Sequence, residues 1–422
     1  MPHDSELFWP FSPLSRRACL SAALGAAVAL AFDANADAQS SRNSFADWVA
    51  GFRPRALKRG ISEQTYNRVM NAVKPDTSVY ELQRSQPEFT EQLWQYINRR
   101  CSEFRVITGK KRVQEYADLL SRIERDYGVD RYGLVGLWGM ESSFGDVVIN
   151  SKYMRPVIPA LAALAWGEPR RRSYWEQELL NSLVIVDRGW ATPSEMIGSW
   201  AGAMGHTQWM PEVWLNMGVD FDHDGRVSPF GKPDDALAGT ARYLAERGRY
   251  KRGEAWGCEV KLPAGFRMRL ADNRTWRAYV KWHQLGVTRA DGAAFARPGD
   301  QVRLWIPIAG GPAFLIGQNY LAFRSYNPSS SYTLALVHLG DLIRGDGPFR
   351  HQFPGGERPP TLAEVQEIQR RLNEQGFRTD GMDGRVGSDT VAAIRAFQQE
   401  VGMQPADGYA GLKVLARLRQ GT

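Results

Sequence analysis

The chain has 422 residues, of which 43% are hydrophobic and 11% aromatic, with 53 Lys and Arg against 46 Asp and Glu. This composition excludes a disordered or collagen-like chain, and the length predicts two to four domains. Three Cys are too few for a disulfide scaffold, and no pair among the six His has the H-E-x-x-H spacing of zinc peptidases.

The first 38 residues have the pattern of an export signal. Two basic residues, Arg16 and Arg17, precede an Ala, Leu and Val run over residues 18–32, which is too short to span a bilayer. Residues 36–38, Ala-Asp-Ala, fit an A-x-A cleavage site. The alternative, a short buried helix, does not explain the order of these features. We therefore predict a cleaved signal peptide over residues 1–38 and a periplasmic protein, and the segment around the Arg pair also resembles the twin-arginine export consensus.

The chain that remains after cleavage is basic, and its charge is unevenly distributed. Without residues 1–38 it has 51 Lys and Arg against 42 Asp and Glu, a net charge of +9. Residues 361–419 hold eight basic and eight acidic side chains, so the excess lies in residues 39–360. An anionic polymer is the natural partner of such a chain. For an exported bacterial protein this favours the cell wall over nucleic acid, the other common partner of basic proteins.

Residues 39–344 read as a helical body. Apolar residues recur at helical spacing between residues 44 and 125, Gly128 then ends a helix, and Asp130 can cap the next one. One of the two Cys that remain after cleavage, Cys101, lies in this part.

A small strand-rich subdomain is predicted inside the helical body, over about residues 255–317. Short runs of β-branched and aromatic residues, among them 279–282 and 302–306, are separated here by Gly and Pro. Cys258 lies in this part, and the sequence leaves open whether it pairs with Cys101.

Residues 345–360 are rich in Pro and Gly and are predicted to be a linker. A compact helical module follows over residues 361–419. Because the body and the module each have a complete apolar pattern, we expect few contacts to cross the linker.

Glu141 is the first residue with a chemical signature. The helix capped by Asp130 carries Glu141 on the same apolar face as four large hydrophobic residues: Leu134, Val135, Leu137 and Trp138. No Lys or Arg lies within one helical turn of it. An unpaired carboxyl in apolar surroundings has a raised pKa, which suits a general acid near neutral pH. The alternative is a structural glutamate that reaches solvent or a distant Arg.

The segments around and after Glu141 carry further signals. Residues 139–145 read Gly-Met-Glu-Ser-Ser-Phe-Gly, and residues 169–174 read Pro-Arg-Arg-Arg-Ser-Tyr. Residues 199–211 combine small residues, which let a backbone approach a ligand, with Gln208 and aromatics that can hydrogen-bond and stack on sugars.

Together these segments resemble the lytic murein transglycosylases, in particular the membrane-bound lytic transglycosylase B family (glycoside hydrolase family 103). They match its E-[TS]-x-[FW]-G, P-R-R-x-x-Y and F-A-G-A-M-G-x-x-Q-[FW]-M-P patterns, with Trp200 for the first Phe. A later R-Y-N-x-S-x-x-Y pattern matches residues 324–332, except that Ser325 intervenes after the Arg. The resemblance covers about residues 45–345.

The resemblance implies a mainly α (α+β) fold with a lysozyme-like catalytic core and the inserted strand-rich subdomain. It also implies that Glu141 is the sole catalytic carboxylate, acting as acid and base. Arg170 and Arg171 would meet the anionic lactyl and peptide groups of the substrate. The other substrate-binding residues implied by position are Tyr174, Ser199, Gln208, Tyr243, Tyr326, Asn327 and Tyr332.

A single carboxylate predicts a reaction without water. Ordinary glycosidases place a second Asp or Glu across the scissile bond, and the matched segments contain none. The substrate can replace it, because the N-acetyl group of N-acetylmuramic acid (MurNAc) can stabilise the developing cation and its C6 hydroxyl can attack C1. We therefore expect a lytic transglycosylase that forms 1,6-anhydro-MurNAc ends and needs no cofactor for this chemistry. The alternatives are a hydrolytic muramidase and a non-catalytic peptidoglycan-binding scaffold.

An acidic loop predicts a structural calcium site. Asp220, Asp222 and Asp224 match positions 1, 3 and 5 of an EF-hand loop, with a Gly at position 6. Position 12 would be Gly231, which offers no carboxylate, so the loop would have to close on Asp234 or on Asp235. An ordinary Asp-Gly turn is the alternative.

The C-terminal module resembles the peptidoglycan-binding domain type 1. Its pattern D-G-x-x-G-x-x-T-x-x-A-[IV]-x-x-F-Q is matched between Asp383 and Gln398, and three helices are expected over residues 361–419. Such a module raises the local concentration of an enzyme on its polymer. The expected partners are peptidoglycan strands and cell-wall synthesis or divisome proteins, with the chain itself a monomer.

Overall fold

The computed structural model describes residues 44–84, 91–146 and 154–421. The predicted signal peptide therefore lies outside the described residues and stays a prediction. Within the described ranges, no helix is both long enough and apolar enough to cross a membrane.

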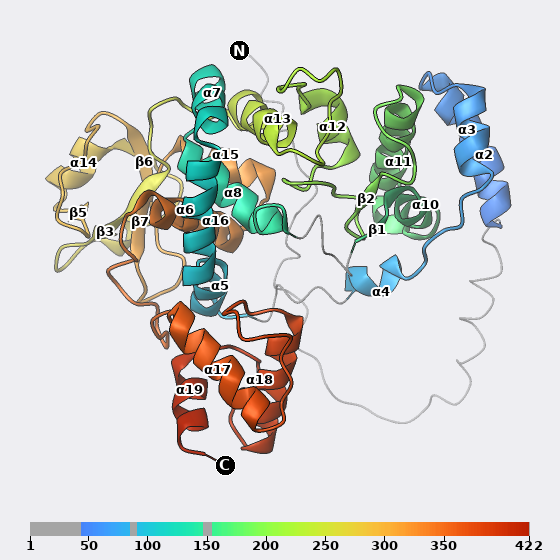
Figure 1. The fold of residues 1–422 in the computed structure, drawn as a ribbon. Coiled ribbons are helices and arrows are strands. Elements are labelled where there is room, and N and C mark those ends of the chain that lie inside the picture. Colours follow the sequence, from blue (N-terminus) through green and yellow to red (C-terminus); the bar gives the residue numbers. More distant parts are fainter. Residues whose placement is uncertain (1–43, 85–90, 147–153, 422) are drawn as a thin grey trace, which may run out of the picture.

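The body is mainly helical, as expected (Figure 1). Its helices are α2 (Phe45–Lys58), α3 (Glu63–Met70), α4 (Val79–Arg84), α5 (Leu93–Arg100), α6 (Glu103–Glu115), α7 (Ala117–Tyr127), α8 (Arg131–Ser142), α10 (Val157–Gly167), α11 (Arg172–Asp187), α12 (Pro211–Met217), α13 (Asp234–Glu246), α15 (Gln318–Tyr326) and α16 (Ser330–Arg344). A short 3-10 helix, η2 (Pro169–Arg171), precedes α11. An antiparallel pair joins β1 (Arg155–Pro156) to β2 (Ile197–Gly198).

Helices α8 and α16 form the centre of the body. A side chain at Gly136 would place its Cβ 2.7 Å from the carbonyl oxygen of Leu336, and one at Gly340 would come within 2.8 Å of that of Tyr132. Glycine at both positions lets the two backbones approach closely. Most of α8 is buried, and on the side away from α16 Trp138 packs against Tyr116 and His206.

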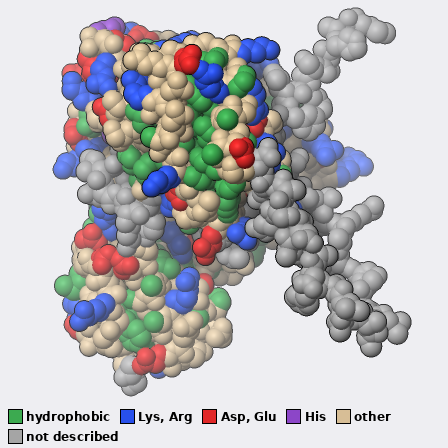
Figure 2. Space-filling model, turned by 90° about the vertical axis from the view of Figure 1, so that its right-hand side faces the viewer, with side chains coloured by type: hydrophobic (Ala, Val, Ile, Leu, Met, Phe, Trp, Pro, Cys, Tyr) green, Lys and Arg blue, Asp and Glu red, His purple; other side chains and the backbone are tan. Residues whose placement is uncertain are grey.

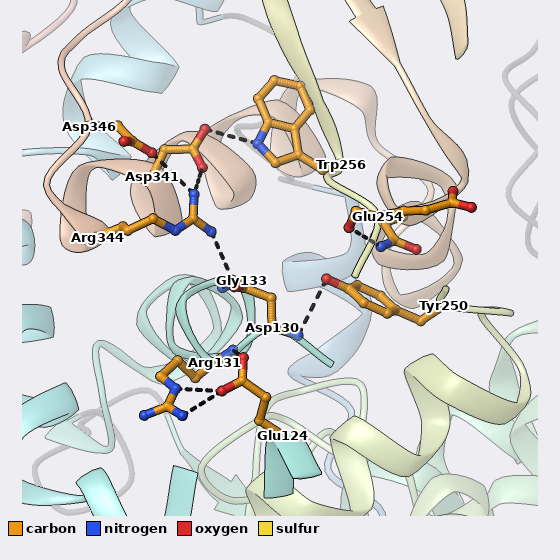
Figure 3. A network of polar contacts seen from close by, with 11 residues as sticks. Glu124, Asp130, Arg131, Gly133, Tyr250, Glu254, Trp256, Asp341, Arg344 and Asp346 are labelled. Carbon is orange, nitrogen blue, oxygen red and sulfur yellow. Dashed lines mark hydrogen bonds and ion pairs between the residues drawn. The ribbon is translucent and has the colours of Figure 1, made fainter. Parts of the chain in front are cut away.

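The beginning of α8 is fixed by polar contacts (Figure 3). Asp130 caps the helix, because its Oδ1 accepts a hydrogen bond from the backbone N–H of Gly133 at 2.8 Å. Arg344 at the end of α16 pairs with Asp130 at 3.0 Å and with Asp341 at 2.8 Å. Asp341 also accepts from Nε1 of Trp256 at 2.9 Å, so the network reaches the inserted subdomain.

The inserted subdomain contains a five-stranded antiparallel sheet in the order β4-β6-β7-β3-β5. Its elements are β3 (Gly257–Lys261), η3 (Met268–Leu270), β4 (Arg277–Ala278), α14 (Tyr279–Gln284), β5 (Thr288–Arg289), β6 (Gln301–Trp305) and β7 (Ala313–Ile316). The predicted strand-rich character is confirmed, but the run 279–282, expected as a strand, forms α14. Tyr279 and Trp282 are buried three residues apart while Val280 and Lys281 are exposed, which is helical and not strand spacing.

Residues 345–360 connect the body to the module without a helix or strand of their own. They are packed on the body and do not form a free linker. Phe349 stacks on His338 with ring centroids 3.7 Å apart, Phe353 is buried, and the carboxylate of Glu259 accepts the backbone N–H groups of Arg350 and His351.

The C-terminal module consists of α17 (Leu362–Glu374), α18 (Ser388–Glu400) and α19 (Leu412–Arg419), as expected, and lies below α5 in Figure 1. It has its own apolar core, which includes Ile368, Ile394 and Phe397. The expectation of few contacts with the body is wrong. Trp94 packs edge-on against Tyr409 at 5.1 Å, Gln95 donates to Asp407 at 2.7 Å, and Arg385 pairs with Asp146 at 3.3 Å. The Pro and Gly content predicted a connecting segment at residues 345–360, but it could not predict that the body and the module contact each other.

The fold also answers the question of the two cysteines. Cys101 and Cys258 are both free and buried, so they do not pair. Figure 2 shows hydrophobic side chains gathered on the side of the body that carries α2 and α3, with Lys and Arg spread around them.

Candidate active site

Glu141 lies in the last turn of α8 and receives a hydrogen bond from another helix. The hydroxyl of Tyr332, near the start of α16, donates to Oε1 of Glu141. Tyr332 is buried, and burial together with the charge of Glu141 raises the pKa of its phenol well above the usual value. The phenol therefore stays protonated and remains a hydrogen-bond donor.

The turn that follows Glu141 has an unusual backbone. Ser143 (φ 52°), Phe144 (φ 62°) and Gly145 (φ 94°) are all left-handed, a conformation that side chains disfavour. Ser142 holds the turn from one side, because its Oγ donates to the carbonyl of His206 at 2.5 Å and accepts from the N–H of Gly145 at 2.9 Å. The ring of Phe144, 2% exposed, is buried against Trp138.

His206 links α8 to the loop of residues 199–211. Nε1 of Trp138 donates to Nδ1 of His206 at 3.2 Å, so Nε2 carries the proton and donates to the carbonyl of Gly231 at 2.8 Å. Burial lowers the pKa of His206. The imidazole is therefore a neutral structural link near pH 7.

Further tyrosines gather beside this loop. Tyr326 donates to the carbonyl of Thr207 at 2.6 Å, Tyr243 donates to that of Ser325 at 2.9 Å, and the two rings meet edge-on at 5.2 Å. Burial and the charge of Glu141 both raise the pKa of Tyr326, which places this ring in the surroundings of Glu141. Gln208 is left-handed (φ 55°) and its Nε2 donates to the carbonyl of Gly205.

Arg171, Tyr174 and their neighbours form a second group around α11. The Arg171 guanidinium lies over the ring of Tyr174 at 4.3 Å and over that of Trp175 at 4.8 Å, and Trp175 is 6.4 Å from Trp200. Arg170 is exposed.

The loop 199–211 thus contacts both groups, through Trp200 at one end and Thr207 at the other. Ser199 closes the beginning of this loop by hydrogen bonds with the backbone of Ala203. The Oδ1 of Asn327 accepts from the N–H of Ser329 at 3.0 Å.

Glu178, on α11, is a carboxyl that the sequence patterns did not single out. It is 3% exposed, and its Oε2 accepts the backbone N–H of Glu212 at 3.0 Å. Burial raises the pKa of Glu178 to about 7. Glu178 lies three residues after Trp175 and next to Leu179, both of which are buried, but its other neighbours Glu176 and Gln177 are polar and no motif marked it.

The acidic loop brings three of the four predicted ligands together. Carboxylate oxygens of Asp220, Asp222 and Asp235 lie within 4.8 Å of one another. Asp224 lies outside this group, and its Oδ1 accepts from the N–H of Arg226. The loop closes on Asp235, while Asp234 faces Arg122 at 3.9 Å.

The acidic group suits a hard cation. Its donors are all oxygens, which calcium prefers. Burial raises the pKa of Asp235, and the nearby charges of Asp222 and Asp220 raise it further, so these carboxylates repel one another without a cation between them. Lys232 approaches Asp222 at 3.5 Å from the solvent side.

The family model for the transglycosylase SLT domain matches residues 44–341, and that for a peptidoglycan-binding domain matches residues 361–418. The chain belongs to the SLT transglycosylase family. It is a lytic transglycosylase with a C-terminal peptidoglycan-binding domain, so the predicted family and lysozyme-like fold are confirmed.

Similar proteins support this assignment. The membrane-bound lytic murein transglycosylase B of Escherichia coli K12 is 27% identical over 300 residues, which are 68% of this chain and 79% of that protein. The structure of SltB3 from Pseudomonas aeruginosa in complex with NAG-anhNAM-pentapeptide is 40% identical, covers 89% of this chain and 100% of its own, and has a TM-score of 0.69. Escherichia coli Slt35 in complex with calcium is 25% identical, covers 72% and 94% of the two chains, and has a TM-score of 0.59.

Proposed function

We propose that Glu141 is the acid and base of a reaction that cleaves the β-1,4 bond between MurNAc and N-acetylglucosamine in peptidoglycan and leaves 1,6-anhydro-MurNAc ends. The observation that carries the proposal is the Tyr332 hydrogen bond to Glu141, made within a group of tyrosines and backbone carbonyls. Retaining and inverting glycosidases instead pair two carboxyl groups across the scissile bond. SltB3, 40% identical, has been solved with both NAG-NAM-pentapeptide and NAG-anhNAM-pentapeptide, which fits a substrate and an anhydro product.

Glu178 does not take the place of the second carboxylate. It is buried at the beginning of α12, where its Oε2 accepts the N–H of Glu212, and burial raises its pKa to about 7, so it is mostly protonated below that pH. A protonated carboxyl is neither a nucleophile nor a base.

The chemistry then proceeds in two steps with one proton carrier. Protonated Glu141 gives its proton to the glycosidic oxygen as the bond to C1 breaks, and the N-acetyl oxygen of MurNAc stabilises C1. The Glu141 carboxylate next takes the proton of the C6 hydroxyl, whose oxygen attacks C1 and closes the anhydro ring. Glu141 is therefore protonated again at the end of the reaction, and no water has been consumed. Tyr332 donates to one carboxylate oxygen, Oε1, and so fixes how the carboxyl group is turned.

The remaining site residues are proposed as substrate contacts. Tyr243, Tyr326, Asn327, Ser199 and Gln208 would line the sugar positions. Arg170 and Arg171, with Tyr174, would bind the lactyl and peptide carboxylates, since guanidinium groups recognise carboxylates well.

Asp220, Asp222 and Asp235 are proposed to hold a structural calcium ion, which fits their all-oxygen donor set and the calcium complex of the relative Slt35. The ion would tie the start of α13 to the preceding loop and take no part in the chemistry. We also propose that the protein acts in the periplasm after export by residues 1–38.

Mass spectrometry of digested sacculi tests the reaction. Anhydromuropeptides weigh one water less than the reducing muropeptides that a hydrolase would release. Reducing ends alone would show that the enzyme is a hydrolytic muramidase.

A further inference from the structure

Arg105 reaches the carboxyl end of the catalytic helix from α6. Its Nη1 donates to the carbonyl of Gly139, and its Nη2 donates to Oγ of Ser143 at 3.1 Å. These two acceptors lie two residues before and two residues after Glu141. One planar guanidinium therefore clamps the turn of helix that carries the catalytic carboxyl.

The clamped turn would not be stable by itself. Ser143 and Phe144 adopt left-handed backbone conformations although both have a Cβ. Ser142, Gly145 and the Phe144 ring secure the inner side, toward His206 and Trp138. Arg105 contacts the turn from α6.

The environment of Arg105 is unusual for a cation. Among the described residues, its hydrogen bonds go to a carbonyl and a hydroxyl and not to a carboxylate. Burial, with the nearby charge of Arg100, lowers the pKa of Arg105 to about 10, so it remains charged at pH 7. The negative end of the α8 dipole compensates this charge, because the guanidinium donates to the carbonyl of Gly139 in the last turn of the helix.

The peptidoglycan-binding module borders the same turn. Arg385 of the module lies over the ring of Phe104, next to Arg105 in sequence, and pairs with Asp146 just after Gly145. A cavity of about 490 Å³ between body and module is lined by Arg105, Ser143 and Arg385, among others. Arg105 thus stands between the module and the catalytic turn.

We infer that Arg105 is a positioning residue for the transglycosylase reaction: it fixes the turn of residues 139–145 so that Glu141 keeps its orientation toward Tyr332 and the glycosidic oxygen. The inference rests on the proposed role of Glu141. On this inference Arg105 acts on Glu141 through the turn and not by binding the substrate, so its effect should fall on kcat and not on KM.

Arg105→Met and Arg105→Lys test this inference in the mature full-length chain. The Met variant keeps the aliphatic stem but loses both hydrogen bonds, and kcat on soluble glycan strands should fall about 100-fold, as for a misplaced catalytic group, with KM within about threefold. The Lys variant keeps the charge but cannot bridge both acceptors, so its kcat should lie between that of the wild type and that of the Met variant. Activity is measured well below each melting temperature, so that all of the protein is folded.

Two controls separate positioning from stability. Arg112, on the same helix, lies over Trp138 of α8 at 5.9 Å without touching the turn, so Arg112→Met should lower the melting temperature without lowering kcat per folded molecule. Arg105→Ala should regain part of its lost kcat when guanidinium ion at millimolar concentration fills the vacated space.

Unchanged kcat for the folded Arg105→Met and Arg105→Lys proteins, with only a lower melting temperature, would overturn the inference. Glu141→Gln, measured in parallel, tells the two hypotheses apart. If it abolishes activity while the Arg105 variants keep theirs, only the inference fails. If Glu141→Gln stays active, the proposed role of Glu141 fails as well.

Discussion

Tyr332 and Glu141 are 191 residues apart in the chain, and the phenol of the first donates a hydrogen bond to the carboxylate of the second. The close contact of α8 with α16, which Gly136 and Gly340 allow, brings them together. The packing of two central helices is therefore also what completes the active site.

Glu141→Gln should abolish turnover and leave the fold intact. The amide has the same shape and can still accept from Tyr332, but it can neither give nor retrieve a proton. A required general acid and base increases the reaction rate about 10²- to 10⁴-fold, so its loss should lower kcat by a similar factor. Release of anhydromuropeptides measures the activity, and the melting temperature is the control. Activity within a few-fold of the wild type would contradict the assignment.

Tyr332→Phe should lower kcat about tenfold with little change in KM, since the ring remains and only the hydrogen bond to Glu141 is lost. Loss of one hydrogen bond changes stability by roughly 1 kcal/mol, so the protein should remain folded. Tyr320→Phe is a matched control, because its buried hydroxyl donates to the carbonyl of Ser330 and not to the site. Equal kcat values for the two variants would show that the contact with Glu141 does not assist the reaction.

The local part of this site could be predicted from the sequence, and the long-range part could not. Helical spacing placed Glu141 on the apolar face of a capped helix, because both the cap and the spacing are local. Tyr332 was expected only through a family resemblance. Arg105 has no local signal at all, since its two acceptors lie 34 and 38 residues away.

The errors have physical reasons as well. Residues 279–282 have strand-forming side chains, but the packing of Tyr279 and Trp282 on one face selects a helix, and tertiary contacts override propensity. The Pro and Gly content of residues 345–360 excluded regular structure but said nothing of the aromatic contact between Phe349 and His338.

Glu178→Gln should flatten the dependence of stability on pH. Burial raises the pKa of Glu178 from 4.5 to about 7. Below about pH 4.5 both the folded and the unfolded chain carry the proton. Between pH 4.5 and 7 only the unfolded chain loses it, so stability falls as pH rises, by about 1–3 kcal/mol. Above about pH 7 the folded chain has also lost the proton, so the ionisation of Glu178 lowers the stability no further.

The Gln variant cannot ionise and should lack this fall, while its amide oxygen can still accept from Glu212. Melting temperatures of both proteins between pH 4.5 and 7.5 measure the difference. The raised pKa of Asp341 is common to both and cancels in the comparison. Parallel curves would show that Glu178 does not change its charge in this range.

Removal of calcium should lower the melting temperature, and added calcium should restore it by mass action. Magnesium should restore it poorly, because it resists dehydration and takes fewer ligands. Asp222→Asn should weaken the response to calcium more than Asp224→Asn, because only Asp222 belongs to the group with Asp220 and Asp235. If neither the chelator nor calcium changed the melting temperature, the loop would be an ordinary Asp-Gly turn and not a calcium site.

Removal of the module after Pro360 should weaken binding to insoluble sacculi while soluble glycan fragments are still cleaved, because the module provides proximity and not the reacting groups. The melting temperature of the body should fall, since Trp94 and Gln95 lose their contacts with Tyr409 and Asp407. Full-length Tyr409→Ala is the control: it loosens the same contact but keeps the module, so it should lower the melting temperature and retain sacculus binding. Sedimentation with purified sacculi measures the binding, and equal sedimentation with and without residues 361–419 would mean that the module does not hold peptidoglycan.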